Sequence, residues 1–238
     1  MSLNLGKFFS HYNNAKILLD KFGLKFEEDL SKSKRLNSQD YSNIFKKATL
    51  SDKEYAEIYK IALDYNDYNL FIPSNGSLFQ FSQESKNGKL EMRYAYLESP
   101  FDAKNYQDFL KDYDLTYDEA GDAFLEEYQQ YTSESNLKSH ITNIRYDYSE
   151  TQYSELSHPT SHIHIGQRNH VRLQLAYTML PSNFVAFVLR NVYWEHWKTF
   201  IQNDLNRDFY LDHCKPQQGI SKDYLSDLDK KDICIYVK

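Results

Sequence analysis

Cysteine is scarce in this chain of 238 residues, because Cys214 and Cys234 are the only two. Two are too few for the disulfide framework of a small secreted protein, and neither lies in a Cys-x-x-Cys motif. The N-terminal stretch lacks the basic segment and apolar core that mark a signal peptide. We therefore expect a cytoplasmic protein whose two thiols are free and inert.

Long hydrophobic runs and flexible linkers are missing as well. No stretch approaches the roughly 18–20 consecutive apolar residues that cross a bilayer, so we expect no membrane partner. Only 7 glycines and 5 prolines occur, which leaves no low-complexity linker. We predict a single domain over residues 1–238 with three parts: helical over 1–72, sheet-rich over 73–175, and a helix and terminal strand over 176–238.

The chain also has no excess of positive charge. Its 28 Lys and Arg residues face 34 Asp and Glu residues, for a formal net charge of −6. This charge balance argues against sequence-independent electrostatic binding of nucleic acid, which needs a basic surface. A local site for a phosphate-containing small molecule or a nucleic acid is still compatible with this balance. A protein partner or a homo-oligomer is compatible too, since the 21 tyrosines suit interfaces.

Apolar residues recur at helical spacing in several stretches. The stretch 5–22 predicts an amphipathic helix that ends at Gly23, a typical C-cap. Residues 184–201 follow Pro181 and are apolar on nearly every side, which predicts a buried central helix containing Trp194 and Trp197. Two capping boxes predict further helices: Ser51 with Glu54 for a helix over about 51–66, and Thr116 with Glu119 for one over about 116–131.

Other stretches alternate with period two, which predicts strands. The pair Asn87-Gly88 predicts a hairpin, because a type I′ turn needs positive φ at both central residues. Further strands are predicted over 140–148, 160–166, 170–175 and 233–237. Helices followed by meandering strands and a late helix favour an α+β fold: an antiparallel sheet with N-terminal helices and a buried C-terminal helix packed on one face.

The segment from His158 to Gly166 reads HPTSHIHIG and holds three of the eight histidines. In a strand, His162 and His164 share one face and the intervening isoleucines share the other. Matching the apolar faces of neighbouring strands gathers the polar side chains on the opposite face. That set is Arg145, Asp147, His162, His164, His170, Arg172 and Gln174, to which the hairpin can add Glu91 and Arg93.

The first chemistry that suits this face is metal-free acid–base catalysis on a phosphoester. His162 and His164 exchange protons with the substrate, and Asp147 orients one imidazole. Arg145 and Arg172 hold the anionic group, since a guanidinium binds phosphate oxygens in pairs.

The second chemistry is binding of a divalent metal as cofactor. Two histidines on one strand face plus the carboxylate of Asp147 form a 2-His-1-carboxylate set, and His158 is a further candidate ligand beside His162 and His164. A structural interpretation stands beside both chemistries, because His and Arg are ordinary residues on a solvated sheet face.

Most of the second half of the chain resembles a bacterial family known only as a domain of unknown function. The resemblance implies a bacterial cytoplasmic protein with no assigned activity, and an association with defence or toxin–antitoxin neighbourhoods. The segments that carry it are Arg145-Tyr146-Asp147-Tyr148, His158 to Gly166, Leu180 to Leu189, and the later pair Tyr193 and Trp197.

Two functional hypotheses follow. In the first, the protein is a phosphoester hydrolase or nuclease, and its acidic net charge favours a small substrate over a long nucleic acid. In the second, it is a non-catalytic partner protein in a bacterial defence or toxin–antitoxin complex, and the histidine strand is structural. An enzyme should place the tips of the histidine and arginine side chains around one concavity, whereas a partner protein can leave them splayed on a flat or covered surface.

Overall fold

The computed structural model describes residues 5–167, 171–216, 218–232 and 235. Its centre is a seven-stranded sheet in the order β1-β2-β3-β4-β5-β6-β7, so strands that are consecutive in the sequence are neighbours in the sheet. Every pairing in it is antiparallel. This meander confirms the predicted α+β class and its antiparallel sheet.

The strand bounds place two strands inside the stretch 1–72 that was predicted to be helical. The seven strands are β1 (Glu27–Glu28), β2 (Leu70–Ile72), β3 (Ser77–Lys86), β4 (Lys89–Leu97), β5 (Ile144–Ser149), β6 (Ser161–Ile165) and β7 (Arg172–Gln174). A separate pair is formed by β8 (Tyr177–Thr178) and β9 (Gln218–Gly219). The predicted hairpin joins β3 to β4, with φ of 53° at Asn87 and 76° at Gly88.

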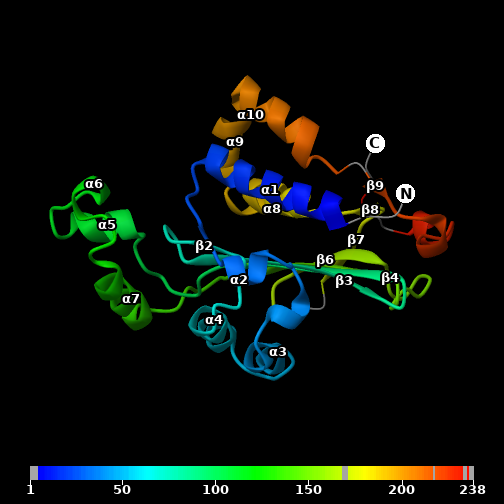
Figure 1. Cartoon of the computed structure of the whole chain (residues 1–238), viewed down its shortest axis with the longest axis horizontal. Coiled ribbons are helices and arrows are strands. Elements are labelled where there is room, and N and C mark those ends of the chain that lie inside the picture. The colour runs from blue at the N-terminus through cyan, green and yellow to red at the C-terminus, as the bar shows by residue number, and fades with distance from the viewer. Residues whose placement is uncertain (1–4, 168–170, 217, 233–234, 236–238) are drawn as a thin grey trace.

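Helices cover both faces of the sheet. In Figure 1, α1 and α8 lie over one face with α9 and α10 outside them, α3 and α4 lie on the other face, and α5 to α7 form a lobe at one end. The helices are α1 (Leu5–Phe22), α2 (Leu30–Ser33), α3 (Asn43–Thr49), α4 (Tyr55–Asp64), α5 (Tyr106–Lys111), α6 (Tyr117–Ala120), α7 (Leu125–Glu134), α8 (Pro181–Val192), α9 (Trp194–Gln202) and α10 (Asp204–Phe209). Short 3₁₀ turns cover Ser38–Asp40, Lys222–Tyr224 and Asp229–Lys231, and a π-helical turn covers Tyr210–Cys214.

The main core lies between the sheet and the layer formed by α1 and α8. Phe184 of α8 packs its ring against Phe79, Phe81 and Tyr94 of the sheet, at centroid distances of 6.5, 6.2 and 5.6 Å. The core residues of β5 and β6 are buried on the same side of the sheet. The C-terminal helices therefore pack on one face, as predicted.

The helix predicted over 184–201 is two helices, because the chain breaks at Tyr193. The Tyr193 hydroxyl lies 3.1 Å from that of Tyr96 and accepts a hydrogen bond from Asn75 at 2.7 Å, which anchors the break to the sheet. Trp197 is 4% exposed, as predicted, whereas Trp194 is 49% exposed. The prediction for Trp194 is wrong, since α9 buries the side that carries Trp197.

Helices are present near both predicted capping boxes, but their bounds differ from those predicted. The helix predicted from residue 51 begins at Tyr55, and the Ser51 hydroxyl instead donates to the Ala48 carbonyl. The box at Thr116 is present, but α6 ends after four residues at Gly121, whose φ is 52°. A new helix, α7, then covers the rest of the predicted span.

Several predictions fall on residues outside those described. They are the strand over 233–237, the thiol of Cys234, and His170. Ile235, which is described, forms a parallel bridge with Leu175. Cys214 is buried with a free thiol, as predicted. No helix in the described ranges is both long enough and apolar enough to cross a membrane.

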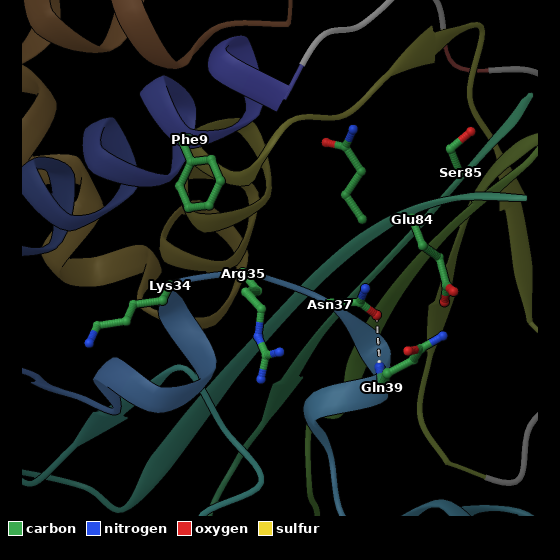
Figure 2. A pocket seen from close by; sticks show the side chains of 8 residues that line it. Phe9, Lys34, Arg35, Asn37, Gln39, Glu84 and Ser85 are labelled. Atoms are coloured by element: carbon green, nitrogen blue, oxygen red, sulfur yellow. Dashed lines mark hydrogen bonds between the residues drawn. The ribbon is translucent and has the colours of Figure 1, made fainter.

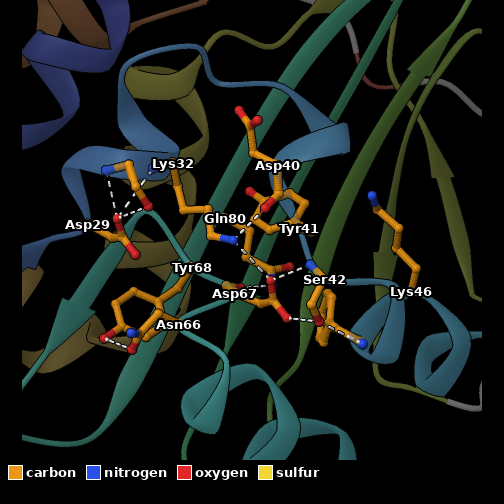
Figure 3. A network of polar contacts seen from close by, with 12 residues as sticks. Asp29, Lys32, Asp40, Tyr41, Ser42, Lys46, Asn66, Asp67, Tyr68 and Gln80 are labelled. Atoms are coloured by element: carbon orange, nitrogen blue, oxygen red, sulfur yellow. Dashed lines mark hydrogen bonds and ion pairs between the residues drawn. The ribbon is translucent and has the colours of Figure 1, made fainter.

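A buried carboxylate joins α2 and α3 to the turn before β2 (Figure 3). The Asp67 side chain is fully buried and accepts hydrogen bonds from the backbone N–H and the hydroxyl of Ser42, which caps α3. Lys32 of α2 lies 3.3 Å from the same carboxylate. The Asp67 carbonyl accepts from Gln80 of β3. One side chain therefore ties α2 and α3 to the turn before β2.

Candidate functional site

Strand pairing brings the predicted polar residues together on the sheet face opposite the main core. Asp147 of β5 pairs with His162 of β6, and Arg145 pairs with His164. On the outer sides, Arg93 of β4 pairs with Asp147, and Arg172 of β7 pairs with His164. Directly paired residues point to the same face, so all of them share it.

Asp147 is the centre of the cluster. Its Oδ2 lies 2.7 Å from Arg145 Nε, 3.3 Å from His164 Nε2 and 4.0 Å from His162 Nε2. Its Oδ1 lies 3.7 Å from Arg93 Nε. Although burial alone raises the pKa of Asp147, the hydrogen bond from His164 and the charges of Arg145, His162 and Arg93 lower that pKa to about 2. The carboxylate is therefore ionised at neutral pH.

His162 is held in one tautomer. Its side chain is 2% exposed, and its Nδ1 lies 2.9 Å from the Pro159 carbonyl oxygen. A carbonyl only accepts, so Nδ1 carries the proton and donates it. Burial lowers the pKa of His162 to about 4, against the opposing charge of Asp147. Nε2 of the neutral ring therefore carries a lone pair, and it lies 4.0 Å from Asp147 Oδ2.

His158 and Gln174 lie beside this cluster with unpaired polar atoms. The His158 ring is perpendicular to that of His162 at a centroid distance of 5.3 Å, and the His162 and His164 rings are 4.8 Å apart. His158 Nδ1 and Gln174 Nε2 are buried with no hydrogen-bond partner within the described structure. Burial, together with the charge of Arg172, lowers the pKa of His158.

The structure thus brings together Asp147, His162, His164 and Arg145, as the alternation predicted. Arg93 was only an optional member of the predicted face, yet it contacts Asp147 directly. The contact between His162 and Pro159 was not predicted, and its only sequence signal is the proline three residues before the histidine. Asp147, His162 and His164 also offer three ligand atoms within 4.8 Å of one another, so these residues could hold a metal ion.

The low pKa of His162 predicts a loss of stability in mild acid. The unfolded chain binds the proton with a pKa near 6.5 and the folded chain only near 4, so the unfolded state gains protons first as the pH falls. Lowering the pH from 6.5 to 4.5 should therefore cost roughly 2–3 kcal/mol at this residue. Urea unfolding at both pH values, with a chelator present, measures the change.

The matched variants are His162→Gln, which removes the group, and His140→Gln, which changes an exposed histidine elsewhere. His162→Gln should show a smaller loss between the two pH values than the wild type. His11, whose pKa is also lowered to about 4 by burial, should leave part of the loss in place. Equal losses in His162→Gln and in the wild type would contradict the assignment.

A hollow of about 480 Å³ lies away from the histidine cluster (Figure 2). It opens between Phe9 of α1, the loop that carries Lys34 and Arg35, and the end of β3. Asn37, Gln39, Gln83, Glu84 and Ser85 complete its lining. No residue of the histidine cluster lines this hollow, so the hollow is separate from the candidate catalytic residues.

Comparisons with curated proteins and with solved structures find no match. A family model matches the stretch that contains the sheet, the histidine strand and the C-terminal helices. Its span of residues 21–236 takes in nearly the whole chain, and its description assigns no activity. The chain therefore belongs to the family of uncharacterized conserved proteins designated DUF2290.

Proposed function

We propose that the protein is an enzyme that cleaves a phosphoester at the cluster of Asp147, His162 and His164. The observation that carries this proposal is the convergence of a neutral, tautomerically fixed imidazole, a second imidazole and an ionised carboxylate at one point. Such a set can accept and return a proton during hydrolysis. It lies among the guanidinium groups of Arg93 and Arg145.

The neighbouring arginines indicate which class of substrate the site would bind. Arg93 and Arg145 contact the carboxylate of Asp147, and Arg172 pairs with His164, so three positive charges lie on the face that carries this single carboxylate. The side chains of Arg93 and Arg145 are 60% and 52% exposed, so each can reach an incoming ligand. Guanidinium groups bind phosphate oxygens in pairs, which favours a phosphoester over a neutral ester. The net charge of −6 favours a small substrate over a long nucleic acid.

The imidazoles would activate a water molecule for attack on phosphorus. His162 Nε2 can take the water proton directly, or the two imidazoles can hold a metal ion that acidifies the water. The water oxygen forms a bond to phosphorus, and the ester P–O bond breaks. A proton then passes to the departing oxygen.

The test is hydrolysis of two chromogenic esters by the full chain, p-nitrophenyl phosphate as a monoester and bis(p-nitrophenyl) phosphate as a diester. We expect His164→Ala and Asp147→Asn to lower kcat/KM by about 10²–10⁴-fold, the usual contribution of an acid–base group. His140→Ala, which alters an exposed histidine outside the cluster, should leave kcat/KM unchanged. Circular dichroism checks that each variant is folded.

His164 is a better test than His162, because its side chain is 12% exposed whereas that of His162 is 2% exposed. Truncating the buried ring of His162 would also leave the Pro159 carbonyl without its donor, so His162→Ala should lower the melting temperature as well as the activity. Hydrolysis that survives undiminished in both His164→Ala and Asp147→Asn would overturn the proposal.

The alternative proposal is a non-catalytic partner protein in a defence or toxin–antitoxin complex. One observation favours it: His162 is almost fully buried and bonds a backbone carbonyl three residues away, as a structural histidine does. In that case neither ester is hydrolysed, and the cluster variants change the melting temperature without changing any activity. The same two assays therefore separate the enzyme from the partner protein.

A further inference from the structure

Two acceptor atoms face each other inside the cluster. Nδ1 of His162 is committed to the Pro159 carbonyl, so Nε2 carries a lone pair. This nitrogen lies 4.0 Å from an oxygen of the ionised Asp147. Neither atom has a proton to offer the other. A cation placed between them would satisfy both, and so the arrangement is one that a positive ion stabilises.

Nε2 of His164 is the third candidate ligand atom. His164 Nε2 lies 3.3 Å from the same Asp147 oxygen, and the three atoms all lie within 4.8 Å of one another. Ligand bonds of about 2.0–2.2 Å to a metal place neighbouring ligand atoms about 3.0–3.6 Å apart. The separation of 3.3 Å is therefore within the distances found around a bound ion, and side-chain rotation would have to shorten the 4.0 Å separation between Asp147 Oδ2 and His162 Nε2.

The surroundings of the cluster also suit a metal ion. A histidine that binds a metal commonly donates its other ring N–H to a backbone carbonyl, which is what His162 does with Pro159. Asp147 Oδ2 accepts hydrogen bonds from Arg145 and His164, and a metal ion would take the place of the proton on His164 Nε2. His162 and His164 stand two residues apart on one strand, so the sheet holds both side chains on one side.

The identity of the ligand atoms selects the class of ion. Two imidazole nitrogens and one carboxylate suit Zn²⁺, Fe²⁺ or Mn²⁺, whereas Mg²⁺ and Ca²⁺ prefer ligand sets made of oxygen alone. Three protein ligands leave open positions for further ligands, which distinguishes a catalytic site from a closed structural one. The neighbouring arginines make an anionic oxygen the favoured additional ligand.

We propose that Asp147 Oδ2, His162 Nε2 and His164 Nε2 bind one divalent transition-metal ion, with an open position on the side of the arginines. A phosphate oxygen of the substrate occupies that position. The phosphate part of this inference rests on the proposed function, whereas the metal part does not. His158 stands beside the three ligands, and we leave it out of the ligand set because its ring nitrogens are not among the atoms that lie within 4.8 Å of one another.

Isothermal titration of the chelator-treated full chain with ZnCl₂ tests the metal site, and CoCl₂ gives an absorption spectrum that reports nitrogen ligation. We expect one saturating site per chain in the wild type. Asp147→Asn and His164→Ala should weaken its binding by at least about 10–100-fold. His140→Ala and His158→Ala should retain it, and millimolar MgCl₂ should not displace the zinc. Circular dichroism confirms the fold of each variant.

The absence of a saturating site in the wild type would overturn the metal proposal. Full binding in both Asp147→Asn and His164→Ala would also overturn it, by placing the ion elsewhere. A site lost in His158→Ala would contradict the three-residue ligand set. Esterase activity that survives the chelator refutes the metal-assisted route and leaves the proposed function intact. Zinc binding at these residues with no hydrolysis of either ester keeps the metal site and refutes the phosphoesterase.

Discussion

Replacing Trp197 by alanine should lower the free energy of unfolding by about 3–5 kcal/mol, the cost of truncating a large aromatic side chain in a packed core. The indole is 4% exposed and lies among the rings of Phe22, Phe200 and Tyr210, at centroid distances of 6.3, 5.4 and 5.3 Å. These rings come from α1, α9 and the turn after α10. The cavity would therefore open where three elements meet, with no single side chain able to fill it.

Trp194 supplies the matched control, because it is the same residue type at the start of the same helix. Its indole is 49% exposed, so Trp194→Ala removes much less buried surface and should cost about 1 kcal/mol or less. Urea unfolding followed by circular dichroism measures both variants without relying on tryptophan fluorescence. Equal costs for the two variants would show that α9 packs differently from the arrangement described.

The site could be predicted from the sequence because strand alternation and burial act together. Ile144, Tyr146 and Ile163 have exposed fractions of 2%, 0% and 0%, so a one-residue slip of either strand would carry large apolar side chains into water. That constraint fixes the register of β5 against β6. The register in turn places Asp147 opposite His162, with no knowledge of the chemistry required.

The depth of the site could not be predicted in the same way. Alternation says which face a side chain takes, but it does not say what covers that face. His162 is buried although it lies on the polar face, and its cover includes the loop that carries His158 and Pro159. That loop has no periodic pattern, and its contacts are set by tertiary packing.

The break between α8 and α9 escaped prediction for a related reason. The apolar pattern is continuous across Tyr193, so periodicity alone favours one helix. The chain turns there because the Tyr193 hydroxyl reaches Tyr96 on the sheet and Asn75 in a loop, both about a hundred residues away. Such contacts leave no local signal, and Trp194 was therefore assigned to the wrong environment.

Strands β1 and β2 also escaped prediction from the sequence, because they are short. They contain two and three residues, too few to display alternation. Their pairing with each other and with β3 places the turn before β2 beside α2 and α3. This is the region in which the carboxylate of Asp67 is buried, and no periodic pattern around Asp67 indicates that burial.

Asp67→Ala should destabilise the fold by about 3–5 kcal/mol, because it removes one partner of a buried ion pair and leaves the others unsatisfied. Lys32 would lose the carboxylate at 3.3 Å, and the backbone N–H of Ser42 would lose its acceptor at 2.7 Å. Asp67→Asn should cost less, since the amide oxygen can still accept from Ser42. Asp227, whose side chain is 91% exposed in its ion pair with Lys230, is the matched control, and its change to alanine should cost far less than Asp67→Ala. Urea unfolding ranks the three variants, and an Asp67→Ala cost as small as that of Asp227→Ala would show that this carboxylate does not hold the N-terminal segments to the sheet.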